Sequence, residues 1–330
     1  MSLGFLTQNN NGWEKQDVWR GKAAVAAIVL TLVVILRPEL TNESLENVRQ
    51  WAQEISSPEI HLGGDVATPP PAVPQLKEGA VGYVPGDVVG LMLKDEKSGA
   101  ILFGQNEYQP LPLASITKLL SALVILDLRP DWAATTTVIG ADYLDTHVYA
   151  GDVYTLGELW QTGLVGSSNK AILSLVNALG LTEEDFVQRI NIKAKELGMS
   201  GTNLVDPTGW SEQNLATASD IAILIREVNQ KEEIRQTLQI LELDLYSAER
   251  KKQHHLWNTN WLLLGWIPND FVSVVGKTGY LPASGYNFAA RIETASGQKF
   301  LVVVLGAKDN ESRFGEAKKV VDWASNSYNW

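Results

Sequence analysis

Three short motifs contain the residue types that serine acyl-transfer chemistry needs. The first, Ser115-Ile-Thr-Lys118, opens an apolar segment that is expected to be helical. Residues three apart lie on the same face of a helix, so the Lys118 ammonium can reach the Ser115 hydroxyl. A serine needs an adjacent base to become a nucleophile, and lysine can be that base when burial or a neighbouring cation lowers its pKa. Alone, the motif also fits a serine helix cap followed by a surface lysine.

The second motif is Ser167-Ser-Asn169, between two apolar helical segments. It fits a helix-capping loop, since Ser and Asn are preferred caps. It also supplies a hydroxyl that can relay a proton and an amide that can orient a lysine and a substrate amide. The third motif, Lys277-Thr278-Gly279, lies in an apolar segment expected to be a strand, where a glycine often marks the close approach of another backbone. A peptide could add to the sheet edge there, with its carboxylate near Lys277.

The order and spacing of the motifs make them a joint signal, because Ser167 follows Lys118 by 49 residues and Lys277 follows it by 159. The set resembles the penicillin-binding proteins and serine β-lactamases, which carry Ser-x-x-Lys, Ser-x-Asn and Lys-Thr-Gly in this order. More narrowly, it is similar to the D-alanyl-D-alanine carboxypeptidase family of low-molecular-mass penicillin-binding proteins. The narrower resemblance extends over about residues 88–323 and rests on residues 112–118, 195–199, 202–209, 214–220 and 258–262.

The resemblance implies a role for each residue of the first two motifs. Ser115 would be the acylated nucleophile, and Lys118 would be its general base. Ser167 and Asn169 would line the cleft, where they pass a proton to the leaving amine and hold the substrate. Whether Lys118 or Ser167 is the acid for the leaving group stays open.

The resemblance also implies how the rest of the cleft is built. Residues 277–279 would form its strand edge, and the backbone N–H groups of Ser115 and Tyr280 would form an oxyanion hole. The family uses an arginine shortly after the last strand to bind the terminal carboxylate of the substrate. Arg313 is the matching position, with Lys308 as an alternative. Tyr280 stands where many relatives have His or Phe, a change that a backbone role tolerates.

The implied function is that of a serine D,D-peptidase acting on peptidoglycan stem peptides through an acyl-enzyme, with no cofactor and no metal. Arg313 favours a carboxypeptidase, whereas segments such as 202–209 favour a D,D-endopeptidase. β-Lactam antibiotics would be covalent inhibitors. A serine β-lactamase is an alternative, although no separate Glu-containing loop signature lies between the second and third motifs. A catalytically silent cell-wall-binding protein is another, against which the three intact motifs argue.

Composition excludes several other classes of chemistry. The chain has no cysteine, so it can form no disulfide, thiolate metal site or cysteine nucleophile. Its 4 histidines leave little for a multi-histidine metal site. The net charge of −11 argues against nucleic acid as a partner, because phosphate backbones are bound by clustered Lys and Arg.

The first 86 residues are expected to attach the protein to a membrane. After a tail of residues 1–22 that contains basic residues, residues 23–36 are uncharged and apolar. This run is shorter than the roughly 20 residues of a typical span but suits an export signal. We expect a signal-anchor at 23–37, with a cleaved signal or a buried helix as alternatives. Residues 38–86 would be a stalk with a proline-rich linker, and the chain after it would face outward in the bacterial cell envelope.

The remaining residues, 87–330, are expected to form one mixed α/β (α+β) domain. Segments with strand patterns are 88–93, 100–103, 272–275, 286–293 and 300–305. Segments with helical patterns are 116–126, 156–164, 170–179, 183–197, 219–229 and 311–325, while 230–252 favours strand and loop. This order indicates an antiparallel sheet built from N- and C-terminal strands and covered by helices, with an all-helical insertion.

Overall fold

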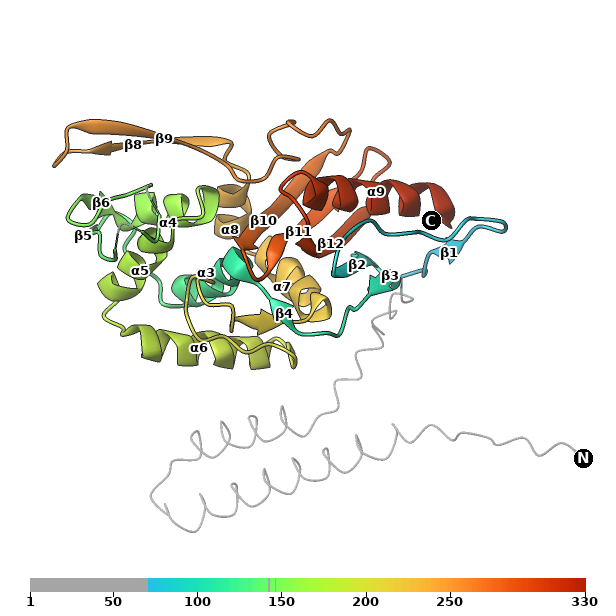
Figure 1. Ribbon diagram of the computed structural model, residues 1–330, viewed down its shortest axis with the longest axis horizontal. Helices are drawn as coiled ribbons and strands as arrows, with labels where there is room; N and C mark the ends of the chain where they lie inside the picture. Colours follow the sequence, from blue (N-terminus) through green and yellow to red (C-terminus); the bar gives the residue numbers. More distant parts are fainter. Residues whose placement is uncertain (1–70, 142, 146) are drawn as a thin grey trace, which may run out of the picture. The chain divides into compact units, whose positions relative to one another are not determined.

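An antiparallel sheet of five strands forms the centre of the domain (Figure 1). The computed structural model describes residues 71–141, 143–145 and 147–330. In the order of their pairing, the strands are β10 (Ser273–Leu281), β11 (Gly285–Glu293), β12 (Lys299–Ala307), β2 (Gly90–Asp95) and β3 (Ile101–Gln105). The prediction of one antiparallel sheet made from strands at both ends of the domain is therefore confirmed.

Helices cover both faces of this sheet, so its central strands are apolar on both sides. On β12, Val302 and Val304 pack toward α9 (Ser312–Ser327), where Phe314 and Val320 are fully buried. The alternate residues of the same strand, such as Val303, pack with the other helices in a second core. Strand β10, which carries the third motif, therefore has one face that is covered by helices. The first two motifs lie beside that face.

Apart from α8, the other helices follow the predicted segments closely. They are α3 (Thr117–Asp127), α4 (Leu156–Val165), α5 (Asn169–Ala178), α6 (Glu183–Glu196), α7 (Ala218–Gln230) and α8 (Glu232–Leu238). Each of α4 to α7 begins at a threonine or serine whose side chain accepts a hydrogen bond from the third helical N–H. These caps are Thr155, Ser168, Thr182 and Thr217. Local sequence therefore sets where each helix starts.

The insertion between the strands is not all helical, which corrects the prediction. Short strands β5 (Thr135–Thr137) and β6 (Val153–Thr155) pair, as do β4 (Leu111–Pro112) and β7 (Leu215–Ala216). The β-branched residues of β5 and β6 favour extended backbone. A hairpin of β8 (Glu242–Ser247) and β9 (Lys252–Trp257) follows α8. Part of the 230–252 segment is thus strand as expected, but α8 was not foreseen there.

The start of the described chain is bound to its end. Strand β1 (Gln75–Leu76) pairs with β13 (Tyr328–Asn329), and Trp323 of α9 donates its indole N–H to the Val81 carbonyl. Further along, Tyr83 donates its hydroxyl proton to Glu316. The described residues from 71 onward belong to one compact unit that ends at Trp330.

The predicted tail and signal-anchor, residues 1–37, lie outside the described residues. Among residues 71–141, 143–145 and 147–330, none of the helices combines the length and the hydrophobicity that a membrane span requires.

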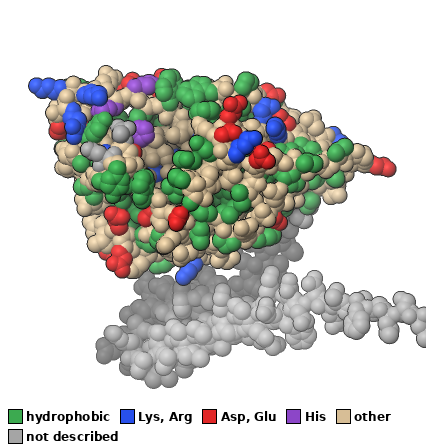
Figure 2. All heavy atoms as spheres, viewed as in Figure 1, with side chains coloured by type: hydrophobic (Ala, Val, Ile, Leu, Met, Phe, Trp, Pro, Cys, Tyr) green, Lys and Arg blue, Asp and Glu red, His purple; other side chains and the backbone are tan. Residues whose placement is uncertain are grey.

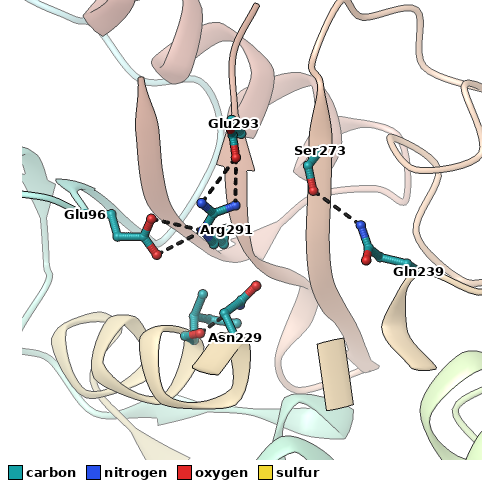
Figure 3. A network of polar contacts seen from close by, with 7 residues as sticks. Glu96, Asn229, Gln239, Ser273, Arg291 and Glu293 are labelled. Carbon is teal, nitrogen blue, oxygen red and sulfur yellow. Dashed lines mark hydrogen bonds and ion pairs between the residues drawn. The ribbon is translucent and has the colours of Figure 1, made fainter. Parts of the chain in front are cut away.

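The end of the sheet away from the third motif is held by ion pairs (Figure 3). The Arg291 guanidinium lies between the carboxylates of Glu96, at 2.9 Å, and Glu293, at 3.2 Å. These side chains line a polar hollow of about 670 Å³ beside α7 and α8. Arg291 pairs with a carboxylate on each side, so its half-buried charge is compensated where this end of the sheet is exposed to solvent.

Candidate active site

The first motif places its lysine amine within hydrogen-bond distance of its serine hydroxyl. Ser115 lies in a single turn of 3₁₀ helix (Ala114–Ile116) that runs into α3, and Lys118 is in the first turn of α3. Lys118 Nζ lies 2.7 Å from Ser115 Oγ, and it donates to Asn169 Oδ1 at 2.6 Å and to the Thr208 carbonyl at 2.8 Å. The lysine side chain is fully buried. The first two motifs therefore meet at one amine.

Burial favours the neutral form of this amine, which is the form that can act as a base. Removal of Lys118 from water disfavours its charged form and lowers its pKa to about 7. The carboxylates of Asp206 and Asp145 oppose this shift, because each favours the ammonium form. The sequence analysis requires burial or a nearby cation before a lysine can act as the base. The fold provides the burial.

The second and third motifs meet at another lysine. Lys277 Nζ donates to Ser167 Oγ at 2.8 Å, and the Lys277 side chain is fully buried on β10. Its pKa lies well below the ordinary lysine value, first because of burial and then because of the nearby charges of Lys118 and Arg313. Thr278 turns its hydroxyl to Thr259 Oγ1 at 2.6 Å. Lys118, Lys277 and Arg313 therefore lie close enough to affect one another, and a carboxylate that entered this region would favour the charged forms of the two lysines.

Ser167 is held by an unusual backbone conformation and a rigid neighbour. Its φ of 65° lies in the left-handed region, which costs a non-glycine residue about 1–3 kcal/mol and is typical of functional sites. The next residue, Ser168, caps α5 and donates its hydroxyl to Asp145. Asp145 also accepts the backbone N–H groups of Asn169 and Lys170, at 2.8 and 2.9 Å. The Asp145 carboxylate thereby positions the start of α5 and with it the Asn169 amide.

The Thr208 carbonyl is positioned by a carboxylate in a tight loop. Asp206 Oδ1 accepts the backbone N–H groups of Thr208, at 2.7 Å, and Gly209, at 2.8 Å, while Oδ2 accepts that of Ser211. The buried Ser121 hydroxyl of α3 donates to the Pro207 carbonyl at 2.6 Å. This loop is therefore tied to the helix that carries Lys118.

Glycine allows β10 to pass close to the nucleophile. A Cβ on Gly279 would lie 2.6 Å from the Leu113 carbonyl oxygen and 3.1 Å from the Ser115 nitrogen. Contacts this short do not occur in relaxed structures, so only a glycine lets the strand edge lie against the turn of Ser115. The close approach expected from the sequence at Gly279 is present.

Arg313 supports the same strand from α9. It is buried, and its Nη1 donates to the carbonyls of Gly279, at 3.0 Å, and Asn287, at 3.2 Å. Its Nε is a buried donor with no hydrogen-bond partner among the residues that the structure describes. Tyr280, half exposed, stacks on the Tyr286 ring at 4.2 Å. The alternative cation, Lys308, is exposed and pairs with Asp87 at 3.2 Å.

Sequence reasoning missed the supporting residues Thr208, Thr259 and Asp145. The first two lie in segments that carried the family resemblance, residues 202–209 and 258–262, but no role was assigned to them. Asp145 lies in a loop with no periodic pattern that would have marked it. Their contacts to Lys118, Thr278 and α5 join segments far apart in the chain, which local patterns do not report.

The fold is that of penicillin-binding proteins. A penicillin-binding protein homologue from Mycobacterium tuberculosis superposes with a TM-score of 0.67 at 24% identity, covering 76% of this chain and 96% of its own. Penicillin-binding protein D2 from Listeria monocytogenes, solved in its ampicillin-bound form, gives 0.64 at 22% identity, covering 74% and 100%.

The family follows from sequence. Residues 89–309 match the model of the D-alanyl-D-alanine carboxypeptidase family, peptidase S11, and the chain belongs to that family. It is 27% identical to the D-alanyl-D-alanine carboxypeptidase DacF of Bacillus subtilis, over 72% of this chain and 62% of that one. It is also 27% identical to a D-alanyl-D-alanine endopeptidase of Pseudomonas aeruginosa, over 78% and 82%. The chain thus spans less than two thirds of the Bacillus relative.

Proposed function

We propose that the protein is a serine D,D-peptidase that cleaves peptidoglycan stem peptides through an acyl-enzyme on Ser115. The observation that carries this is the environment of the Lys118 amine. A neutral amine has two N–H groups and one lone pair. Asn169 Oδ1 and the Thr208 carbonyl can only accept, so they take both N–H groups. The lone pair is then left to accept the hydroxyl proton of Ser115.

The proposed reaction needs no group beyond the chain and water. Ser115 Oγ attacks the carbonyl carbon of a D-amino acid while its proton moves to Lys118 Nζ, and the backbone N–H groups of Ser115 and Tyr280 stabilise the oxyanion. The intermediate then collapses, the C–N bond breaks, and the amine leaves with a proton delivered through the Ser167 hydroxyl beside Lys277. Water hydrolyses the ester and restores Ser115.

The basic side chains at the site support a substrate that carries a carboxylate beside the scissile bond, because such a group would favour the charged form of Lys277. In the proposed complex, Lys277 and Thr278 bind this carboxylate at the strand edge. Arg313 donates to the Gly279 carbonyl and so supports this strand edge. A terminal carboxylate would make the enzyme a carboxypeptidase, whereas a crosslink would make it an endopeptidase. Mass spectrometry of muropeptides after digestion of purified sacculi separates the two by the products released.

A fluorescent penicillin is expected to label the protein covalently, since the antibiotic would acylate Ser115 as the substrate does. The label should be lost in Ser115→Ala, in which the hydroxyl is absent but the fold is kept. Gel fluorescence and intact-protein mass spectrometry measure the adduct. Absence of any adduct on the folded wild-type protein would refute the class of reaction, and rapid turnover of the penicillin would indicate a β-lactamase instead.

Removing the negative charge of Asp206 is expected to shift the pH dependence of acylation downward. The Asp206 carboxylate raises the pKa of Lys118 against the effect of burial, so Asp206→Asn should lower that pKa below about 7. The neutral base then persists to lower pH, and the acid limb of the acylation rate moves with it. The pH profile of acylation by penicillin measures the shift, with the exposed Glu183→Gln as control. A shift to higher pH would contradict this electrostatic role.

We further propose that residues 23–37 anchor the enzyme in the cytoplasmic membrane, with the catalytic unit on the outer side. The support is the charge pattern of the sequence together with the location of the proposed substrate outside that membrane. Protease added to intact spheroplasts should digest the catalytic unit, and carbonate-washed membranes should retain the protein. Recovery in the soluble fraction would point to a cleaved signal.

A further inference from the structure

The β8–β9 hairpin has an outer face that the proposed reaction does not use. Side chains alternate along both strands, and Leu245 and Leu256 are buried on the inner face. The outer face carries three cross-strand pairs, namely Glu242 with Trp257, Asp244 with His255, and Tyr246 with Gln253. Aromatic rings, carboxylates, an imidazole and an amide are therefore presented together on one side of the hairpin.

Two exposed tryptophans form the centre of this surface, which we call the tryptophan platform: Trp257 at 49% and Trp266 at 51% exposure. Their ring centroids are 5.8 Å apart. Trp266 contacts Trp261 at 5.7 Å, and Trp261 stacks on the buried Phe314 at 5.8 Å. The exposed rings are thus continuous with the core of the domain through a series of aromatic contacts. A tryptophan side chain has only two rotatable bonds, so such a surface loses little conformational entropy when it binds a ligand.

The outer hairpin face also carries hydrogen-bond acceptors next to the rings. His255 lies 3.0 Å from an Asp244 oxygen and 3.3 Å from a Glu242 oxygen, and both carboxylates are more than half exposed. His255 also meets the Trp257 ring edge-on at 4.9 Å. In Figure 2, hydrophobic side chains gather where the hairpin joins the domain, while Lys and Arg lie at its far tip. Carboxylates beside the rings disfavour an anionic ligand or membrane and favour one rich in hydroxyl and amide donors.

The platform is connected to the strand edge of the active site. Directly after Trp257, the Asn258 side chain donates to the Ile240 carbonyl at 2.8 Å, which fixes the end of the hairpin. The next residue, Thr259, accepts the hydroxyl proton of Thr278 at 2.6 Å. The segment that carries the tryptophans is therefore hydrogen-bonded to β10 only two residues after Trp257, which gives a polymer with its peptide along β10 a direct route to the rings.

We propose that the tryptophan platform binds the glycan strand to which the substrate peptide is attached. The apolar C–H face of a pyranose ring stacks on an indole, and the hydroxyl and N-acetyl groups at its rim donate to Glu242 and Asp244. This inference rests on the proposed function, because that function places a peptide linked to a polysaccharide in the cleft. It makes the platform a specificity site that distinguishes peptides on a glycan from free peptides.

Binding of chitotetraose, a soluble β-linked N-acetylglucosamine tetramer, tests the site directly by calorimetry with the full chain. We expect Trp257→Ala to bind about fivefold to tenfold more weakly, as loss of one stacking contact predicts, and Trp257→Phe to recover part of the affinity. Tyr108→Ala, which removes an aromatic side chain that is 65% exposed elsewhere, is the matched control. Equal affinity of wild type and Trp257→Ala, or no binding by either, would overturn the proposal.

A second measurement separates this inference from the proposed function. The ratio of kcat/KM for a glycan-linked pentapeptide to that for the free pentapeptide should fall about fivefold to tenfold in Trp257→Ala. An unchanged ratio overturns the platform while leaving the peptidase in place. Tetramer binding that depends on Trp257, without any peptidase activity, supports the platform and refutes the proposed function. Binding to vesicles of anionic phospholipid that depends on Trp257, without tetramer binding, would identify the surface as a membrane contact and overturn the glycan assignment.

Discussion

Replacing Lys118 with methionine is expected to reduce the rate of Ser115 acylation by about 10³-fold or more, within the range for loss of a positioned general base. Methionine fills the buried space of the side chain but offers no lone pair of comparable basicity to the Ser115 hydroxyl. Stopped-flow acylation by a fluorescent penicillin measures the rate. The exposed Lys195→Met on α6 is the control, because it makes the same chemical change away from the cleft. An acylation rate within tenfold of wild type would exclude Lys118 as the base.

The same substitution separates activity from stability. Burial lowers the pKa of Lys118 to about 7, far below that of an unfolded lysine. Folding at neutral pH therefore disfavours the protonated form that the unfolded chain prefers, which costs free energy. The unfolded state binds more protons between these two values, so the contribution of Lys118 to the free energy of unfolding increases as pH rises from about 7 toward the ordinary lysine pKa. Lys118→Met should flatten this rise. The wild-type acylation rate should fall as pH drops through about 7.

The Gly209→Ala substitution is expected to destabilise the domain by about 2–5 kcal/mol and to slow acylation. Gly209 has a φ of 84°, and a Cβ there would lie 1.8 Å from the Ala114 carbonyl oxygen and 2.9 Å from the Ser115 nitrogen. A left-handed alanine costs roughly 1–2 kcal/mol, and overpacking against backbone adds about 1–3 kcal/mol. The relief of this clash must move either the Thr208 carbonyl or the turn that carries Ser115, and both contact Lys118.

Gly198→Ala is the matched control for this prediction. Gly198 has a nearly equal φ of 80°, but no described atom lies within 4 Å of the added Cβ. It should therefore lose only about 1 kcal/mol, the cost of the backbone conformation. Denaturant unfolding measures both variants, and penicillin acylation reports the site. If the two alanines cost the same, the close approach of the Gly209 loop to Ser115 is not a constraint on the fold.

Local patterns predicted the helices and strands well wherever one face is consistently apolar. The expected helix over 116–126 is α3, and the expected strands over 286–293 and 300–305 are within β11 and β12. They failed where pairing partners are remote or the segment is polar. The expected strand over 272–275 continues as β10 through the motif to Leu281, because pairing with β11 holds the polar and glycine residues extended.

The site shows the same division. The reach of Lys118 to Ser115 follows from helical spacing, so sequence alone could state it. The meeting of Lys277 with Ser167, 110 residues earlier, depends on how α5 and β10 pack, which no spacing rule contains. A search for reactive side chains could not find the Thr208 carbonyl, because it is a backbone group. It nevertheless accepts one of the hydrogen bonds of the Lys118 amine.

The joined ends of the described unit determine the path of mechanical force through it. Tension on the chain at residue 71 is first resisted by the pairing of β1 with β13 and by the bonds from Trp323 to Val81 and from Tyr83 to Glu316. All of these contacts end on α9 or just beyond it, and α9 covers the face of the sheet opposite to α3. In an enzyme that is held at one end while its polymer substrate moves, this force would first separate the short pairing of β1 with β13.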